Sequence, residues 1–227
     1  MISNIYKDKY NKYKNKYLRL KKLIQVGGNS KLIASENDLK VYLRGDIVYL
    51  EEDDTYGLSK FNVRTFENYF SYARNIINMV NKYNLKKDRV LVLGFGIGGL
   101  PLKFTTYDDT KRVDSVDLNP IMYKLFDKIQ NYLVEYPKDK INNIVMSAEE
   151  YIDNTDEKYD LVVDDVFGDK KILLDYEKIS KIINKDGYLF INLHYMSDFR
   201  KIEPILKDNF SSVVIVRDNE LLVICRK

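Results

Sequence analysis

The sequence predicts a doubly wound α/β fold, and three observations lead to that prediction. An apolar run, Arg89–Leu93, stops abruptly at four closely spaced glycines. A second apolar strand ends in Asp117, twenty-three residues after Gly94. From Arg89 onward the expected strands and helices alternate until two final strands. Such alternation requires right-handed crossovers and a mostly parallel sheet with helices on both faces.

The glycines after Leu93 give the strongest functional signal in the chain. Glycine permits positive φ and lets a ligand approach the exposed amides of the following helix. The three glycines Gly94, Gly96 and Gly98 form only a weak motif by themselves. Asp117, however, ends the next strand, where a carboxylate would meet the two hydroxyls of an adenosine ribose. The glycines and the carboxylate together predict a cofactor that contains a nucleoside.

The other elements follow from periodicity and turn signals. Residues 39–51 alternate and turn at Gly45-Asp46, which predicts a β-hairpin, and residues 63–83 have helical periodicity. Beyond the glycines we expect helices at 100–107, 120–133, 148–153, 171–183 and 198–207, and strands at 112–117, 142–146, 159–164 and 187–193. Strands at 211–216 and 221–225 are too close for a crossover, so the sheet is expected to end in an antiparallel hairpin.

The first 29 residues differ from the rest in charge. They carry eight basic residues and one acidic residue, whereas the remainder has 29 basic and 33 acidic residues. Apolar and aromatic residues recur at spacings of three and four from Tyr6 to Ile24, which predicts a helix that ends at Gly27-Gly28. We therefore divide the chain into a basic helical leader at 1–29, a small β-hairpin region at 30–60 and a cofactor-binding domain at 61–227.

The leader needs a partner for its apolar face, and several remain open. It could dock on the body of the protein or on a second copy in a homodimer, or contact virion components, a membrane surface or nucleic acid. The leader resembles the Tyr/Lys/Leu-rich segments with a following Gly-Gly that open many proteins of mimivirus-like giant viruses. That resemblance implies cleavage after Gly28 and a place in the virion. Since no transmembrane segment or signal peptide is recognised, we expect an intracellular protein, in the host cytoplasm or virion if viral.

Candidate catalytic groups follow two of the later strands. Asp164 and Asp165 end the strand at 159–164, where ligands of open α/β sheets collect. Asp165 is expected to orient a nucleophile and accept its proton; the alternative for both residues is helix capping. His194, after the next strand, is either a general base or a structural group. Cys225 is expected in the core, and no metal site is expected because there is no Cys/His cluster.

Five ordered segments resemble the spermidine synthase-like branch of class I S-adenosylmethionine-dependent methyltransferases. The resemblance implies a Rossmann-like methyltransferase sheet that ends in an antiparallel hairpin and is preceded by a small β-hairpin and helix. It also implies that Gly94, Gly96 and Gly98 form the cofactor loop, Asp117 binds the ribose, Ser147 and Ala148 lie beside the adenine, and Asp165 lies near the transfer site. The segments are Val90–Gly99, Val116–Pro120, Ser147–Glu149, Tyr159–Asp165 and Asp186–Asn192.

Three departures from that branch bear on the reaction. Ile97, Ser147 and Gly168 stand where aminopropyltransferases resemble one another in having aspartates, and each lost carboxylate removes a contact to a cationic amine. Our leading hypothesis is therefore an S-adenosylmethionine-dependent methyltransferase with an unknown acceptor. The alternatives are a polyamine aminopropyltransferase that uses decarboxylated S-adenosylmethionine, and a non-catalytic virion or interaction protein. A nicotinamide dehydrogenase fits the glycines and Asp117 but not the terminal hairpin.

Overall fold

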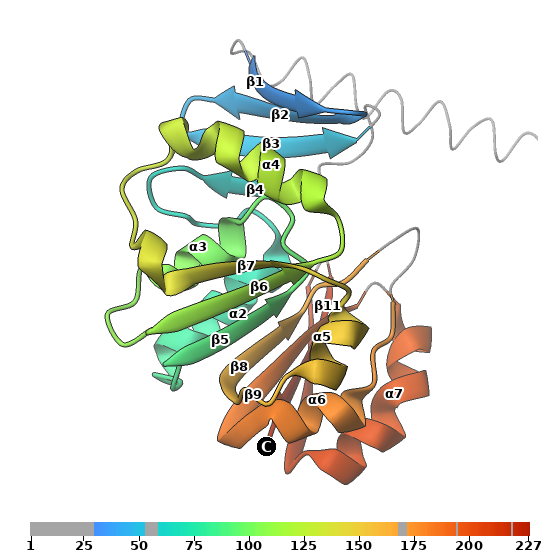
Figure 1. The fold of residues 1–227 in the computed structure, drawn as a ribbon. Helices are drawn as coiled ribbons and strands as arrows, with labels where there is room; N and C mark the ends of the chain where they lie inside the picture. Colours follow the sequence, from blue (N-terminus) through green and yellow to red (C-terminus); the bar gives the residue numbers. More distant parts are fainter. Residues whose placement is uncertain (1–29, 53–58, 168–171, 194, 219) are drawn as a thin grey trace, which may run out of the picture. The chain divides into compact units, whose positions relative to one another are not determined.

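A seven-stranded sheet forms the centre of the body built by residues 32–227 (Figure 1). The computed structural model describes residues 30–227 apart from 53–58, 168–171, 194 and 219. The predicted leader helix, its Gly27-Gly28 end, Gly168 and His194 therefore lie outside the described residues. In spatial order the strands are β10 (Ser212–Arg217), β11 (Leu221–Arg226), β9 (Ile183–Leu193), β8 (Tyr159–Asp164), β5 (Arg89–Leu93), β6 (Arg112–Asp117) and β7 (Ile141–Val145).

The strand pairing confirms the predicted doubly wound sheet with an antiparallel ending. Strands β9, β8, β5, β6 and β7 pair in parallel with one another in that order. β11 is antiparallel both to β9 and to β10. β5 lies between β6 and β8, so the order of the chain reverses beside it. Ligands of open α/β sheets bind outside the carboxyl ends of the strands at such a reversal.

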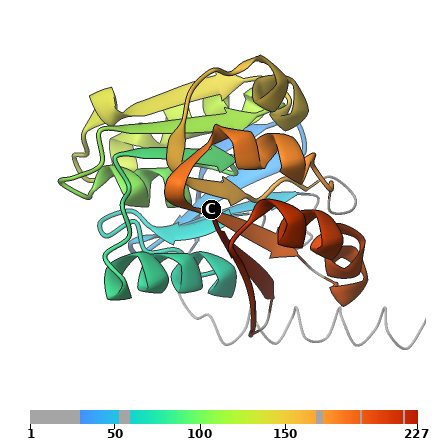
Figure 2. The ribbon, with the colours of Figure 1, turned by 90° about the horizontal axis from the view of Figure 1, so that it is seen from below.

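Helices cover both faces of this sheet (Figure 2). The alternation of side chains along β5 divides the core, because successive residues of a strand point to opposite faces. Val90 and Val92 pack with α2 (Ser71–Lys82) and α3 (Gly99–Thr105). Leu91 and Leu93 belong to the cluster on the other face. The helices of that face are α5 (Ala148–Asn154), α6 (Tyr176–Ile182) and α7 (Met196–Asn209).

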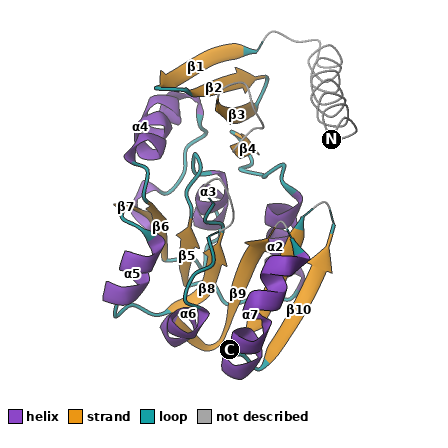
Figure 3. Cartoon of the chain, turned by 90° about the vertical axis from the view of Figure 1, so that its right-hand side faces the viewer, coloured by secondary structure: helices purple, strands orange, loops and turns teal. Residues whose placement is uncertain are grey.

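A second, four-stranded sheet lies at one end of the large sheet (Figures 1 and 3). The predicted hairpin at 39–51 is confirmed, since two of its strands pair antiparallel across Gly45-Asp46. The sequence did not predict the two outer strands; β1 has a burial pattern without regular alternation, and β4 has only four residues. The order is β1 (Lys31–Glu36), β2 (Leu39–Arg44), β3 (Ile47–Glu52) and β4 (Ser59–Asn62).

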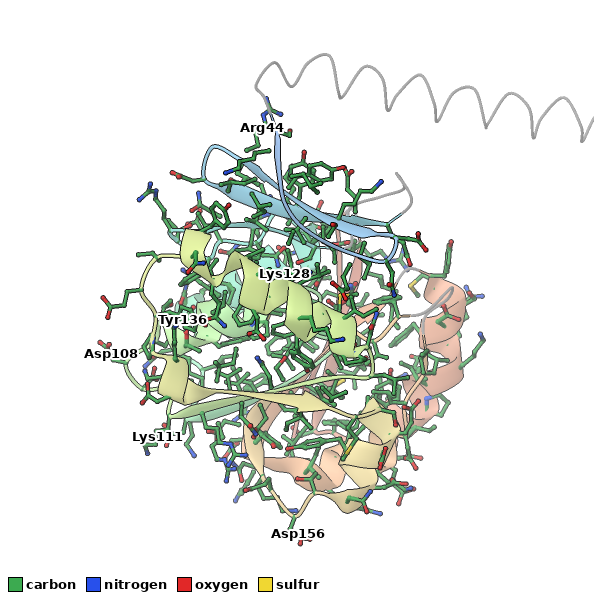
Figure 4. All side chains as sticks on the ribbon, turned by 45° about the horizontal axis from the view of Figure 1, so that its top comes forward. Arg44, Asp108, Lys111, Lys128, Tyr136 and Asp156 are labelled. Atoms are coloured by element: carbon green, nitrogen blue, oxygen red, sulfur yellow. The ribbon has the colours of Figure 1, made fainter. Side chains whose placement is uncertain are left out.

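The small sheet shares a hydrophobic core with the glycine turn and with α4 (Pro120–Ile129). Phe61 of β4 is fully buried, and a Cβ placed on Gly99 would lie 2.8 Å from its ring. Phe95 and Ile97 of the glycine turn belong to the same cluster. Figure 4 shows side chains filling the space around α4, where Lys128 donates to Glu36 at 2.7 Å. The small sheet therefore supports the glycine turn from behind.

The helix expected at 63–83 begins only at Ser71, which corrects the sequence prediction. The Asn62 side chain accepts hydrogen bonds from the amides of Arg64 at 2.8 Å and Thr65 at 3.1 Å. Phe66 has a φ of 53°, which no α-helical residue adopts. Side-chain hydrogen bonds of this kind offer the backbone an alternative to the helix. The apolar spacing of this segment comes from a buried turn.

Several further boundaries differ from the sequence prediction, and two of them have an identifiable cause. α6 was expected from residue 171 but begins at Tyr176, where the Asp175 side chain accepts a hydrogen bond from the Lys178 amide at 3.1 Å. β9 was expected from residue 187 but begins at Ile183, which pairs with Tyr159 across an irregularity in the ladder. In both cases a polar or irregular feature, which periodicity does not report, sets the boundary.

Replacement of Phe61 should show how strongly the small sheet is bound to the rest of the core. We expect Phe61→Ala to lower the free energy of unfolding by about 3–5 kcal/mol, because the truncation leaves a cavity beside the glycine turn. Lys60→Ala, an exposed neighbour on the same strand, should change it by less than about 0.5 kcal/mol. Urea unfolding of both variants measures the difference. Equal, small effects would mean that the small sheet contributes little to the core.

Candidate functional site

The candidate site lies at the carboxyl ends of β5, β6 and β8, beside the reversal in strand order. Main-chain hydrogen bonds join these three ends directly. The Gly94 amide donates to the Val116 carbonyl at 2.8 Å, and the Asp165 amide donates to the Leu93 carbonyl at 2.9 Å. The glycine turn is therefore held between the ends of its two neighbouring strands.

Two glycines of this turn are required by their surroundings. Gly94 has a φ of 92°, and a Cβ there would lie 2.5 Å from the Asp165 carbonyl oxygen. Gly98 has a φ of 88°, and a Cβ there would lie 2.9 Å from the Phe95 ring. Residues other than glycine rarely adopt such φ values. At Gly94, moreover, the backbone oxygen at 2.5 Å could not move away from an added Cβ. The amides of Gly94, Phe95 and Gly98 donate hydrogen bonds within the protein, so these glycines are needed for the close packing of the turn itself.

Asp117 lies at the end of β6 and is bound to the same turn. One of its carboxylate oxygens accepts a hydrogen bond from the Phe95 amide and the other from the Asn119 amide, each at 2.8 Å. Burial raises the pKa of this carboxyl group, while hydrogen bonds from the backbone of Asn119, Phe95 and Gly96 oppose the rise. Each oxygen of a carboxylate has a second lone pair. Asp117 can therefore hold the turn and still accept hydroxyl groups.

Asp165 follows β8, and its carboxylate is held at both oxygens. The Tyr72 hydroxyl of α2 donates to one oxygen. The Asn192 side-chain amide of β9 donates to the other at 2.8 Å. Burial and the neighbouring Asp165 carboxylate raise the pKa of Tyr72 well above its usual value, so the phenol remains a donor near neutral pH. The orientation of Asp165 is thus set by two elements far away in the sequence.

A pocket opens in front of the glycine turn and Asp165, whereas Asp117 is not among the residues that line it. Gly94 and Gly96 line one part of it, and the rings of Phe70 and Tyr72 line another. Asp165 is the single acidic side chain among the described residues that line it. Buried polar side chains also contribute, namely Ser59 of β4 and Asn68 of the following turn. The small sheet therefore supplies part of the pocket wall, which the sequence did not indicate.

The other sequence-predicted residues have identifiable surroundings. Asp164 is fully buried and accepts hydrogen bonds from the Tyr176 hydroxyl at 2.8 Å and the Val166 amide at 3.2 Å. These contacts place Asp164 in the core. Ser147 is the N-cap of α5 and accepts a hydrogen bond from the Glu150 amide at 3.0 Å, and Ala148 packs in the core cluster beneath it.

Ile97 and Cys225 both lie in the core. Ile97 is fully buried in the cluster shared with the small sheet, so no charge lies at that point of the turn. Cys225 is also buried, and burial raises the pKa of its thiol to about 12. A thiol with that pKa stays protonated and unreactive at neutral pH.

Tyr72 was the functional residue that sequence reasoning missed. Its position in an amphipathic helix does not distinguish it from a core aromatic residue. Asn192 entered the sequence analysis only as the end of the segment Asp186–Asn192 and was not connected with Asp165. Within the described ranges, no three His, Cys, Asp or Glu side chains gather to hold a metal ion, and no helix is long and apolar enough to cross a membrane.

No protein-family model matches the chain. In sequence it is 28% identical over 110 residues to a polyamine aminopropyltransferase of Methanocaldococcus jannaschii, a match that covers 44% of this chain and 36% of the archaeal protein. The aligned part thus spans about a third of that relative.

Similar solved structures include a probable spermidine synthase from Corynebacterium glutamicum and human methyltransferase-like protein 13 in complex with SAH. The first has a TM-score of 0.70 at 14% identity and covers 88% of this chain and 80% of that one. The second has a TM-score of 0.51 at 19% identity and covers 68% and 76%. Together with the sheet order and the terminal hairpin, these likenesses show a Rossmann-like methyltransferase fold.

Substitution of Gly94 should separate backbone strain from steric blockage. Gly45→Ala places a methyl group at a φ of 55° with no atom within 4 Å, so we expect a loss of about 1 kcal/mol in stability. Gly94→Ala adds a clash with a backbone oxygen to the same kind of strain and should cost more than about 3 kcal/mol. Thermal unfolding of the two variants makes the comparison. Equal losses would contradict the close approach of β5 and Asp165.

Proposed function

We propose that the chain is an S-adenosylmethionine-dependent methyltransferase of the spermidine synthase-like type, acting on an acceptor still to be identified. The observation that carries the proposal is the convergence of the glycine turn, Asp117 and Asp165 at one reversal of the sheet. The glycines allow a ligand to approach the backbone of the turn closely, Asp117 offers acceptors for hydroxyls, and Asp165 offers a base. The three groups suit a ligand with a nucleoside at one end and a reacting centre at the other.

The residues at the glycine turn fit an adenosyl ligand. A Cβ on Gly94 or Gly96 would meet neighbouring atoms at 2.5 and 3.3 Å, so the turn is kept free of side chains. In the proposed role, Gly94, Gly96 and Gly98 lie under the ligand and Asp117 accepts the ribose hydroxyls. Ser147 and Ala148 begin α5 after β7 and are proposed to lie on the adenine side. The main-chain amide of Ser147 is then the contact, since its hydroxyl caps the helix.

The proposed reaction assigns Asp165 to the acceptor. A lone pair of the acceptor forms a bond to the methyl carbon while the carbon–sulfur bond breaks, and its electrons return to the sulfur as a neutral thioether. Asp165 takes the proton that the acceptor loses. Since Tyr72 and Asn192 hold both carboxylate oxygens, the base is oriented before the acceptor arrives. Such positioning costs nothing at the moment of transfer.

Methyl transfer is preferred because of the charge in the pocket. Ile97 is buried in the core shared with the small sheet and brings no charge, and Asp165 is the one acid among the described residues of the pocket wall. A cationic amine would find fewer charge-assisted hydrogen bonds there. Aminopropyl transfer is the second candidate, because the archaeal relative is an aminopropyltransferase. Calorimetry with S-adenosylmethionine and its decarboxylated form distinguishes the two.

Other aspects of the proposal rest on sequence alone. We propose a boundary after residue 29, with the leader serving addressing or assembly; the second expected boundary, near residue 60, falls within β4 of the small sheet. Contacts of the leader with virion components, membranes or nucleic acid, its giant-virus resemblance and cleavage after Gly28 stay predictions. A non-catalytic role on the same fold would leave the arrangement of Asp165 without a purpose.

Asp117→Ala should weaken binding of S-adenosylmethionine by about 1–3 kcal/mol, because charge-assisted hydrogen bonds to the ribose are lost. Isothermal calorimetry measures the effect. Asp153→Ala removes an exposed carboxylate on α5 and should leave the affinity unchanged. Heat from NAD, with none from any S-adenosyl compound, would remove the proposal.

Asp165→Asn should lower kcat by roughly 100-fold while the affinity for S-adenosylmethionine stays within a few-fold, because a base acts mainly in the transition state. The acceptor for this assay comes from a screen of amines, phenols and proteins with S-adenosylmethionine tritiated at the methyl group. Asp164→Asn, in contrast, should lower the melting temperature, since Asp164 accepts buried hydrogen bonds. If Asp165→Asn turns over normally, Asp165 is not the base.

A further inference from the structure

We propose that Glu220, in the turn of the C-terminal hairpin, is a positioning residue that fixes Tyr72 and, through Tyr72, Asp165. Its catalytic meaning rests on the proposed function, but the contacts themselves do not. The same carboxylate oxygen of Glu220 accepts two hydrogen bonds, one from the Ser71 hydroxyl at 2.8 Å and one from the Tyr72 amide at 3.0 Å. The Tyr72 hydroxyl then donates to Asp165. The chain of contacts thus runs from the end of the sheet to the candidate base.

The start of α2 explains why a distant carboxylate is needed there. The first amides of a helix have no partner within the helix and carry a partial positive charge. The N-cap residue Phe70 has no side-chain oxygen, and the first turn of α2 contains no acidic residue. Glu220 supplies both the acceptor and the negative charge across a separation of 148 residues from Tyr72. It caps the helix from the hairpin.

The hydrogen bond from the Tyr72 amide to Glu220 also restricts the Tyr72 side chain, which contacts the candidate base. Tyr72 is only 7% exposed, and its backbone is held by Glu220 at one end while its hydroxyl is held by Asp165 at the other. Burial, Asp165 and Glu220 all favour the protonated phenol. A tyrosine held in this way donates to one oxygen of Asp165 and leaves the direction of that carboxylate fixed. Small displacements of such a supporting residue disturb a reacting group.

The contact also gives the antiparallel hairpin a role in the site. β11 pairs with β9, and the residue opposite Leu221 is Leu193, next to Asn192. Asn192 holds the other oxygen of Asp165. The hairpin thus reaches Asp165 by two routes, through Glu220 and Tyr72 and through β9 and Asn192. A sheet that continued with a crossover in place of the hairpin would bring no turn to the start of α2.

The test uses 3-fluorotyrosine placed at position 72 of the full chain, with the fluorine resonance followed against pH in the absence of ligand. Glu220→Ala should lower the pKa of the phenol by about one unit, a tenfold change in proton affinity, because the ring is released from Asp165. Glu220→Gln should keep the phenol pKa close to that of the original chain, since an amide oxygen can accept the same two hydrogen bonds. Glu177→Ala, an exposed glutamate of α6, should change nothing.

A double-mutant comparison separates positioning from charge. When Asp165 is already replaced, in Asp165→Asn, Glu220→Ala should shift the phenol pKa much less, because the partner of the phenol is altered. Ser71→Ala removes one of the two contacts to Glu220 and should give an intermediate shift. Equal shifts with and without Asp165, or no shift in Glu220→Ala, would overturn the proposal.

Because this readout needs no ligand, it is independent of the reaction. Calorimetry with S-adenosylmethionine on the same proteins tests the proposed function, and Glu220→Ala should bind it within about three-fold of the original chain. No heat together with the expected fluorine shifts would reject the function and retain the positioning role.

Discussion

The structure depends on the close approach of three strand ends around Gly94. The Gly94 amide reaches β6 and the Asp165 amide reaches β5, and a single methyl group on Gly94 would collide with the Asp165 carbonyl. These contacts bring Asp117, the candidate ribose-binding residue, and Asp165, the candidate base, to the two sides of one turn. These main-chain hydrogen bonds fix the spacing of the strand ends that carry the two aspartates, and further hydrogen bonds then orient each carboxylate.

The rest of the molecule supports that turn from two directions. Behind it, the small sheet and α4 bury Phe95 and Ile97 in one hydrophobic cluster. In front of it, Tyr72 and Asn192 orient Asp165, and Glu220 fixes the start of the helix that carries Tyr72. The site is thus assembled from the small sheet, the helix before the large sheet, and the terminal hairpin. Each of these parts lies outside the segment that the glycine motif identifies.

The charge of the site bears on the choice of reaction. Among the described residues that line the pocket, Asp165 is the one carboxylate, and the glycine turn presents buried Ile97 at a position where the resemblance implies an acid. A sulfonium cofactor requires few charged partners because its adenosine provides most of the binding contacts. A cationic acceptor requires more of them. The similar folds of a probable spermidine synthase and a methyltransferase agree with either reaction, since fold alone does not determine chemistry.

The sequence by itself determined the doubly wound sheet, the terminal hairpin and the order of the candidate groups, because apolar alternation and glycine turns are local signals. It also gave Asp117 and Asp165 as candidate site residues, because Asp117 ends β6 and Asp165 directly follows β8. It did not determine where α2 begins, because the apolar residues of the turn after Asn62 have the same spacing as those of a helix. It also did not predict the outer strands β1 and β4. Only the tertiary structure decided that Tyr72 and Asn192 contact Asp165 and that Glu220 contacts the start of α2, because contacts between residues up to 149 positions apart depend on how the sheet and helices pack.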